Sequence, residues 1–180
     1  MKASIVLPEG IYDLMMTHLH PASKGPEEVG FLYCSPTENQ HLITFATQVW
    51  EGVPPAGLLR RSRYGIELRD ETKASVIKRA HDLDAAIVEA HTHPYPFDAQ
   101  FSLSDISGFE EFVPHVQWRL KRRPYAALVF GPDSFDALVW RGNGTPVLEG
   151  VVELKDGERE LRPTMKTMKA VGEGSYLGSI

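Results

Sequence analysis

The amino-acid sequence predicts an α/β protein, and three observations support this fold class. Apolar segments of strand length alternate along the chain with segments whose apolar residues recur at helical spacing. The length of 180 residues suits one domain with a single sizeable core. The content of 42% hydrophobic and 24% charged residues is that of an ordinary globular protein.

Three strands and two helices are predicted before residue 84. The strands are expected at 3–7, 30–34 and 42–49. A helix is expected to begin at Pro8. Its apolar face would consist of Ile11, Leu14, Met15 and Leu19. Asp70 is expected to cap a second helix. The inward residues of that helix would be Val76, Ile77, Ala80 and Leu83.

Residues 51–64 are expected to form a long, partly irregular insertion, because they contain two consecutive prolines at Pro54. The insertion also carries Arg60, Arg61 and Arg63, which makes these arginines candidates for binding a substrate. Long loops in compact domains are commonly functional. A solvated loop with no binding role explains the same pattern equally well.

The second half of the chain begins with an apolar run, 84–90, that is typical of a strand buried on both faces. Residues 95–101 are expected to form a loop, and a helix is expected to begin near Ser102. A hairpin is predicted from strands at 125–131 and 135–141. The domain is expected to end at residue 154. Residues 155–180, with few large apolar side chains, are expected to be a peripheral or flexible extension.

The segment His91-Thr92-His93-Pro94 suggests a metal site. Side chains alternate along a strand, so His91 and His93 would point to the same side and reach one ion. Asp105 would supply a third ligand and leave one tetrahedral position for water, as in catalytic zinc sites. The alternative is that Ser102 and Asp105 form only a helix capping box. One aspartate can serve as cap and ligand together.

A water molecule activated by a metal also needs a base, and the candidates are Glu27 and Glu28. Both precede the apolar strand that begins at Gly30. Acidic residues at such a strand entrance are ordinarily solvated. The assignment of a base therefore depends on their combination with the histidines and Asp105.

The glutamates before Gly30, followed downstream by His-x-His-Pro and Ser-x-x-Asp, resemble the JAMM motif of the JAB/MPN zinc metalloproteases. The resemblance covers most of residues 1–150. It implies a JAB/MPN domain over 1–154, with the fold of a three-layer α/β/α sandwich around a mixed sheet, similar to cytidine deaminases. It also implies a zinc ion held by His91, His93 and Asp105.

The same resemblance implies that Glu27 is the general acid/base, since the glutamate of the family lies three residues before the glycine. Glu28, two residues before it, matches less well. Ser102 would help to stabilise the oxyanion. The loop between Pro94 and Ser102 is one residue longer than is usual in the family, and if that shifts the register Ser104 could take this role. The loop also lacks the Gly, Cys and Trp of the eukaryotic deubiquitinases.

The expected function is therefore zinc-dependent hydrolysis of a peptide or isopeptide bond after the C-terminus of a ubiquitin-like protein. A bacterial antiphage conjugation system is one expected setting. Two alternatives stay open: a hydrolase of small peptides or small molecules with the same site, and a catalytically silent scaffold of the same family.

The composition of the chain argues against several other classes of protein. The single cysteine, Cys34, cannot form an internal disulfide, which suits a reducing cytoplasm, and it excludes the Cys-x-x-Cys pair of zinc deaminases. The net charge of −5 argues against a general nucleic-acid binder. No apolar run approaches the roughly 20 residues of a membrane span.

Overall fold

The computed structural model of the protein describes residues 2–21, 24–142, 146–147 and 151–172. Its strands are β1 (Lys2–Leu7), β2 (Val29–Glu38), β3 (Leu42–Gly52), β4 (Leu58–Ser62), β5 (Gly65–Leu68), β6 (Ala86–Thr92), β7 (Tyr125–Phe130), β8 (Phe135–Trp140), β9 (Pro146–Val147), β10 (Val151–Asp156) and β11 (Arg159–Leu161). Its helices are α1 (Ile11–Leu19), α2 (Asp70–Asp82), α3 (Leu103–Arg119) and α4 (Lys166–Gly172), with a 3-10 turn η1 at Pro55–Gly57.

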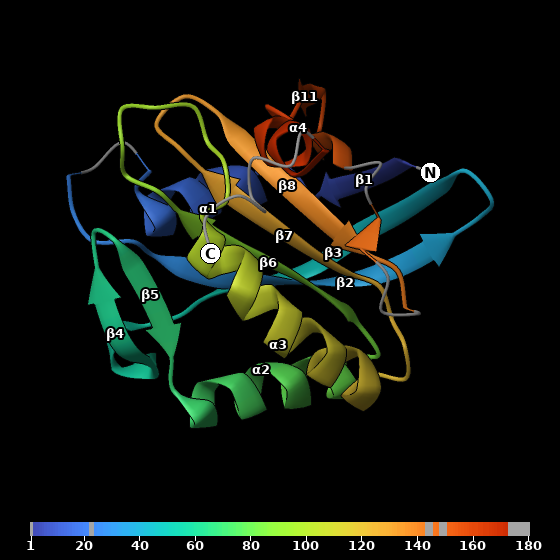
Figure 1. Ribbon diagram of the computed structural model, residues 1–180. Helices are drawn as coiled ribbons and strands as arrows, with labels where there is room; N and C mark the ends of the chain where they lie inside the picture. Colours follow the sequence, from blue (N-terminus) through green and yellow to red (C-terminus); the bar gives the residue numbers. More distant parts are fainter. Residues whose placement is uncertain (1, 22–23, 143–145, 148–150, 173–180) are drawn as a thin grey trace.

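A nine-stranded mixed sheet forms the frame, in the order β11-β10-β1-β3-β2-β6-β7-β8-β9 (Figure 1). The central strand β6 pairs antiparallel with β2 and parallel with β7. It is buried along nearly its whole length, as the apolar run in the sequence predicts. The α/β class expected from the sequence is confirmed by this arrangement.

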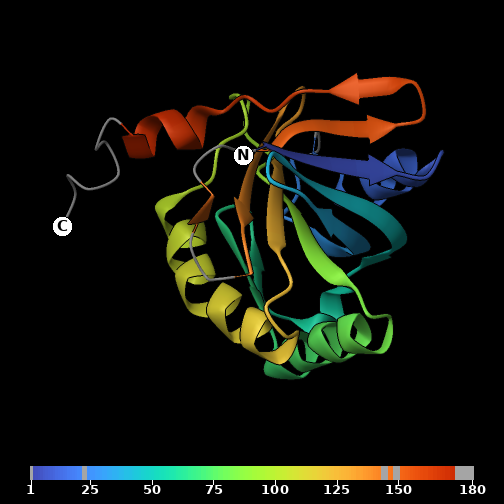
Figure 2. The same cartoon turned by 90° about the vertical axis from the view of Figure 1, so that its right-hand side faces the viewer.

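Helices cover both faces of the sheet. Alternate residues of β6 explain why, since Ile87 joins the apolar cluster that includes α2 and α3, whereas Val88 joins the cluster on the other face with α1. Figure 2 shows α2 and α3 together, away from β10 and β11. Among the described residues, none of the helices has the length and apolar character needed to cross a membrane.

Two predictions about the helices need correction. Leu14 was expected on the inner face of α1, but it is 58% exposed, and the buried residues of this helix are Met15 and Leu19. Asp70 is the first residue of α2 rather than its cap, because Arg69 has the extended backbone of the N-cap.

The predicted irregular insertion at 51–64 is also wrong in part. Its second half forms β4, which pairs with β5 in a separate hairpin. The hairpin forms because Leu58 is buried opposite Leu68, and Ile66 packs against the same apolar cluster as α2 and α3. The apolar residues at both ends of the segment outweigh its proline and arginine content.

The boundary expected after residue 154 falls inside β10. This strand pairs parallel with β1, and its Leu154 is fully buried beside Ile5 in the cluster that includes α1. Within the part of the chain that the structure describes, residues 155–172 therefore continue the domain through β11 and α4. The low content of large apolar residues after Leu154 concealed this continuation of the domain.

The backbone at Gly30 lies in close contact with the ring of Trp50. A Cβ atom at this position would lie 2.7 Å from Cζ2 of Trp50 and 2.8 Å from the carbonyl oxygen of Glu51. Gly30 pairs with Gly52 of β3 on one side and with Ala90 of β6 on the other. The entrance of β2 therefore accommodates the indole only because no side chain is present.

We expect Gly30→Ala to lower the free energy of unfolding by about 1–3 kcal/mol, because the added methyl group overpacks the indole. Urea denaturation followed by circular dichroism measures this change. Gly108→Ala is the matched control, since a Cβ there meets nothing within 4 Å. Because Gly108 lies in α3, this control should be more stable by up to about 1 kcal/mol. Equal effects of the two substitutions would contradict the proposed contact.

Candidate metal centre

Three potential metal ligands meet where β6 ends and α3 begins. His91 lies in β6, His93 follows the strand directly, and Asp105 lies in the first turn of α3. Their ligand atoms all lie within 4.8 Å of one another. Nε2 of His93 is 3.2 Å from Oδ2 of Asp105, and Nε2 of His91 is 3.7 Å from Oδ1 of the same carboxylate. The group could hold a metal ion.

The capping box is present as well. The backbone N–H and the hydroxyl of Ser102 donate to Oδ2 of Asp105 at 2.7 and 2.8 Å, and the Asp105 N–H donates back to the Ser102 hydroxyl oxygen at 3.2 Å. The Oδ1 atom of Asp105 remains directed toward His91. The cap and the possible ligand are thus the same aspartate.

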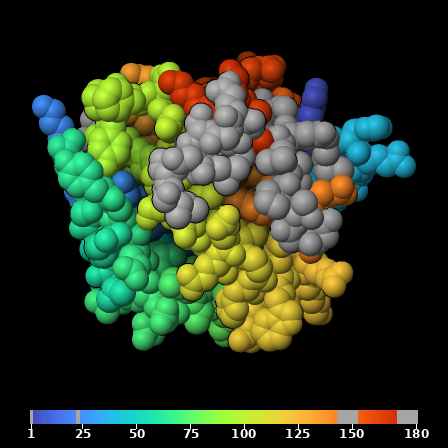
Figure 3. Space-filling view, in the orientation of Figure 1, coloured from blue at the N-terminus to red at the C-terminus, as the bar shows by residue number. Residues whose placement is uncertain are grey.

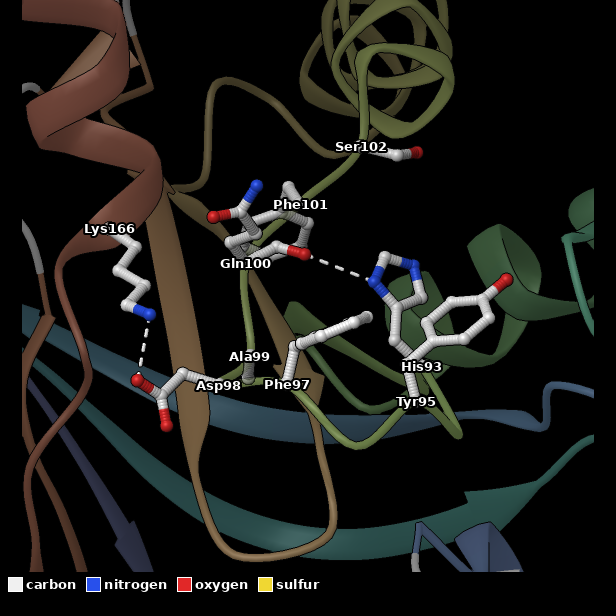
Figure 4. A pocket seen from close by; sticks show the side chains of 9 residues that line it. All are labelled: His93, Tyr95, Phe97, Asp98, Ala99, Gln100, Phe101, Ser102 and Lys166. Atoms are coloured by element: carbon white, nitrogen blue, oxygen red, sulfur yellow. Dashed lines mark hydrogen bonds and ion pairs between the residues drawn. The ribbon is translucent and has the colours of Figure 1, made fainter. Parts of the chain in front are cut away.

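The orientation of His93 is fixed by the backbone. Its Nδ1 lies 3.0 Å from the carbonyl oxygen of Gln100 (Figure 4). A carbonyl oxygen can only accept, so Nδ1 is the protonated nitrogen and the lone pair of a neutral imidazole is on Nε2. That nitrogen faces Asp105, as a metal ligand requires.

His91 is supported by a buried polar chain on its other side. Its Nδ1 lies 3.5 Å from Oε1 of Glu89, and Oε2 of Glu89 accepts a hydrogen bond from the Tyr125 hydroxyl at 2.8 Å. A carboxylate behind a histidine is a common way to orient a metal-binding imidazole. Glu89 therefore lies beside Nδ1 of His91, while Nε2 is the nitrogen that faces Asp105.

The environment of His91 fits a cation. Its side chain is buried, and within the described residues neither ring nitrogen makes a hydrogen bond. Burial disfavours the charged imidazolium, but the negative charges of Asp105 and Glu89 outweigh burial and raise the pKa of His91 to about 10. Burial works the opposite way on Asp105, yet the two histidines hold its pKa well below the usual range. The negative charges in the cluster thus favour a positive charge beside them, and a bound metal ion can supply it.

Of the two candidate glutamates, Glu27 is the one that faces the histidines. It is buried, and its Oε1 lies 3.9 Å from Nε2 of His93. Burial raises the pKa of Glu27 to about 7; the His91 charge opposes that rise and the Asp105 charge adds to it. The carboxylate of Glu28 instead pairs with the guanidinium of Arg61.

The β4–β5 hairpin adjoins the cluster. The backbone N–H of Glu27 donates to the carbonyl oxygen of Ser62 at 2.8 Å, and the Tyr95 hydroxyl donates to the carbonyl oxygen of Arg63. Of the three candidate arginines, Arg61 is engaged with Glu28, and Arg60 lies near enough for its charge to act on the Glu27 carboxylate. Figure 3 shows the loop after β6, in light green, above this hairpin.

A pocket of about 310 Å³ opens beside His93 and Ser102. The loop that follows β6 forms most of its wall, and Lys166 of α4 completes it. Figure 4 shows Lys166 and Asp98 on one side of the pocket and His93 on the other. Of the three candidate ligands, His93 is therefore the one that lines the cavity.

Sequence reasoning missed several groups that support this site. Glu89 carries a visible indication, because it is an acidic residue inside an otherwise apolar strand. Gln100 contributes a backbone carbonyl, which no side-chain pattern reveals. Tyr125 and Lys166 come from distant parts of the chain and have no local motif.

Comparison with known proteins adds no assignment. No protein-family model matches the chain, and no curated protein matches it either.

We expect the protein to bind one divalent cation per chain, and His93→Ala to abolish this binding, because the substitution removes one of three ligands. Metal content after purification without added metal, measured by mass spectrometry, tests this. His41→Ala is the control, since His41 is exposed and lies outside the cluster. Metal retained by His93→Ala, or absent from the unaltered protein, would contradict the site.

Proposed function

We propose that the protein is a zinc metalloprotease of the JAB/MPN type. In this proposal it hydrolyses a peptide or isopeptide bond after the C-terminus of a ubiquitin-like protein. The observation that carries it is the convergence of Glu27, His91, His93, Ser102 and Asp105 from three separate segments. Two of these residues, His93 and Ser102, also line an open pocket. The mixed sheet with helices on both faces is compatible with the JAB/MPN sandwich.

Zinc is the metal we propose, because two imidazoles and one carboxylate form a donor set that suits it. Three protein ligands would leave a position for water or substrate. When bound, zinc would polarise the scissile carbonyl and acidify a water molecule.

Glu27 is proposed to move the proton. Its carboxylate can accept a proton from the attacking water and then donate it to the leaving amine. Burial, which raises the pKa of Glu27 to about 7, supports both steps near neutral pH, although a nearby cation would lower that pKa again. The backbone N–H of Glu27 donates to the carbonyl oxygen of Ser62. This hydrogen bond fixes the backbone position from which the carboxylate side chain extends.

Ser102 is proposed to stabilise the oxyanion of the tetrahedral intermediate. Its hydroxyl lies at the rim of the pocket, where it donates to Asp105 at 2.8 Å. Rotation about the Cα–Cβ bond redirects the same hydroxyl toward a substrate oxygen. A donor of this kind contributes about 3 kcal/mol to transition-state stabilisation.

The surroundings of the site support a protein-sized substrate. Large apolar side chains are exposed on the segments around it: Leu59, Tyr64, Phe97 and Leu103. Tyr64 is 79% exposed and stacks on Tyr95, whose ring lies 6.0 Å from that of His93. Exposed apolar residues that gather at one place commonly mark a protein-binding surface.

A second candidate, a hydrolase of short peptides or small amides, is favoured by the pocket itself. Its volume of about 310 Å³ is that of a small-ligand site. Cleavage of a folded ubiquitin-like fusion can be compared with cleavage of a short peptide that has the same residues at the scissile bond. A much larger kcat/KM for the fusion supports the first candidate, and equal values support the second.

We expect Glu27→Gln to lower kcat by about 10²–10⁴-fold while metal binding is retained, because the substitution removes proton transfer only. Cleavage of the fusion by the zinc-loaded protein, with metal content measured in parallel, gives both quantities. Glu28→Gln is the control, since its carboxylate pairs with Arg61 and should affect kcat little.

Two results would speak against the role of Glu27. Full cleavage by Glu27→Gln would show that another residue is the base. Loss of cleavage in Glu28→Gln alone would identify Glu28 as the base. A protein that binds zinc and cleaves neither the fusion nor the peptide would favour a silent scaffold.

We expect Ser102→Ala to lower kcat by about 10²–10³-fold through loss of the oxyanion donor. The same change removes the N-cap of α3 and should cost about 1 kcal/mol of stability. Steady-state kinetics and thermal unfolding separate the two effects. Ser104 is exposed and lies two residues further along the chain, so Ser104→Ala should leave kcat unchanged. A larger loss of kcat in Ser104→Ala than in Ser102→Ala would identify Ser104 as the oxyanion donor.

A further inference from the structure

A short C-terminal segment lies behind the candidate site. Residues 164–167, called the strap below, lead into α4 and contact residues 98–101, the end of the loop that follows β6. The strap is 60 residues or more from that loop in the sequence. Its contacts therefore join two distant parts of the chain at the site.

The strap is anchored on one buried carboxylate. Asp136 of β8 is fully buried, and its Oδ2 accepts hydrogen bonds from the backbone N–H and the hydroxyl of Thr167 at 2.9 and 2.7 Å. Its Oδ1 accepts from the backbone N–H of Met165 at 3.1 Å. Hydrogen bonds to an ionised carboxylate are among the stronger ones in proteins. These three hydrogen bonds tie the strap to β8.

The strap in turn holds the loop. The hydroxyl oxygen of Thr167 accepts from the backbone N–H of Phe101 at 2.9 Å, and the Thr164 hydroxyl donates to the carbonyl oxygen of Ala99 at 2.8 Å. At the pocket rim, the ammonium of Lys166 lies 2.7 Å from the Asp98 carboxylate (Figure 4). Three contacts thus tether three of the four loop residues 98–101.

Those loop residues are the ones that orient both histidines. The carbonyl of Gln100, between the two tethered positions, accepts from Nδ1 of His93. The ring of Phe101 lies 5.6 Å from that of His91 in an edge-to-face arrangement. Phe101 also precedes Ser102, the N-cap of α3.

We propose that the strap is a positioning element for the metal centre, with Thr167 as its key residue. The hydroxyl of Thr167 bridges Asp136 and Phe101, and so transmits the fixed position of β8 to the loop behind the ligands. This inference rests on the metal site of the proposed function. A strap that served stability alone would leave the geometry and affinity of the metal site unchanged.

The test compares Thr167→Val, which keeps the shape and removes the hydroxyl, with Thr167→Ser, which restores it. Cobalt(II) is the probe, because its visible absorption reports ligand geometry. Titration of the full chain with cobalt(II) gives the affinity, and hydrogen exchange of the Phe101 amide gives the local order.

We expect Thr167→Val to weaken cobalt(II) binding by about 10–100-fold, as changes behind metal ligands commonly do. Its absorption spectrum should change, and the Phe101 amide should exchange faster. Thr167→Ser should restore all three properties. If Thr167→Val fails to fold, Thr164→Val and Thr164→Ser provide a second comparison of affinity and spectrum. Thr164→Val removes the tether to Ala99 and a 3.4 Å hydrogen bond from the Lys166 N–H, and leaves the hydrogen bonds of Thr167 in place.

The two proposals fail in different ways. An unaltered protein that binds no cobalt(II) overturns both the metal site and the positioning role. An unaltered protein that binds it, together with a folded Thr167→Val that has the same affinity and spectrum, overturns the positioning role and leaves the metal site standing.

Discussion

The carboxylate of Asp105 is the group on which the candidate site depends, because it closes a helix and faces two imidazoles at the same time. One oxygen accepts from the N–H and hydroxyl of Ser102, which fixes the first turn of α3. The other is directed toward His91 in β6. The start of a helix and the end of a strand are thereby held in one arrangement. A ligand bound there would need little further ordering of the protein.

The sequence predicted the parts of this site that follow from local rules. Strand periodicity placed His91 and His93 on one side of the chain, and capping chemistry placed Ser102 and Asp105 at the start of a helix. The two motifs lie within fifteen residues of one another, so few alternative arrangements were possible. The structure groups the three candidate ligands as expected and places Glu27 beside them. The α/β class followed in the same way, from the alternation of apolar patterns.

The parts that escaped prediction depend on contacts between distant residues. Asp136 and Thr167 are 31 positions apart, and neither belongs to a motif that would pair them. The carbonyl of Gln100 would be present with any residue at that position, so its role cannot be inferred from residue type. The β4–β5 hairpin was obscured because proline and arginine content outweighed Leu58 and Leu68 in the interpretation. The prediction was therefore limited by contacts between residues far apart in the sequence, rather than by weak helix or strand propensities.

The parallel pairing of β1 with β10 has a consequence for the order in which the protein folds. The edge of β1 that pairs with β10 stays open until residues 151–156 have been synthesised, long after β1 itself. Contacts of such wide sequence separation slow folding, and an unpaired strand edge invites pairing with other chains. Until β10 is available, the nascent chain therefore exposes one edge of β1 to other chains. The topology thus leaves β1 open to misassembly with other chains at that stage.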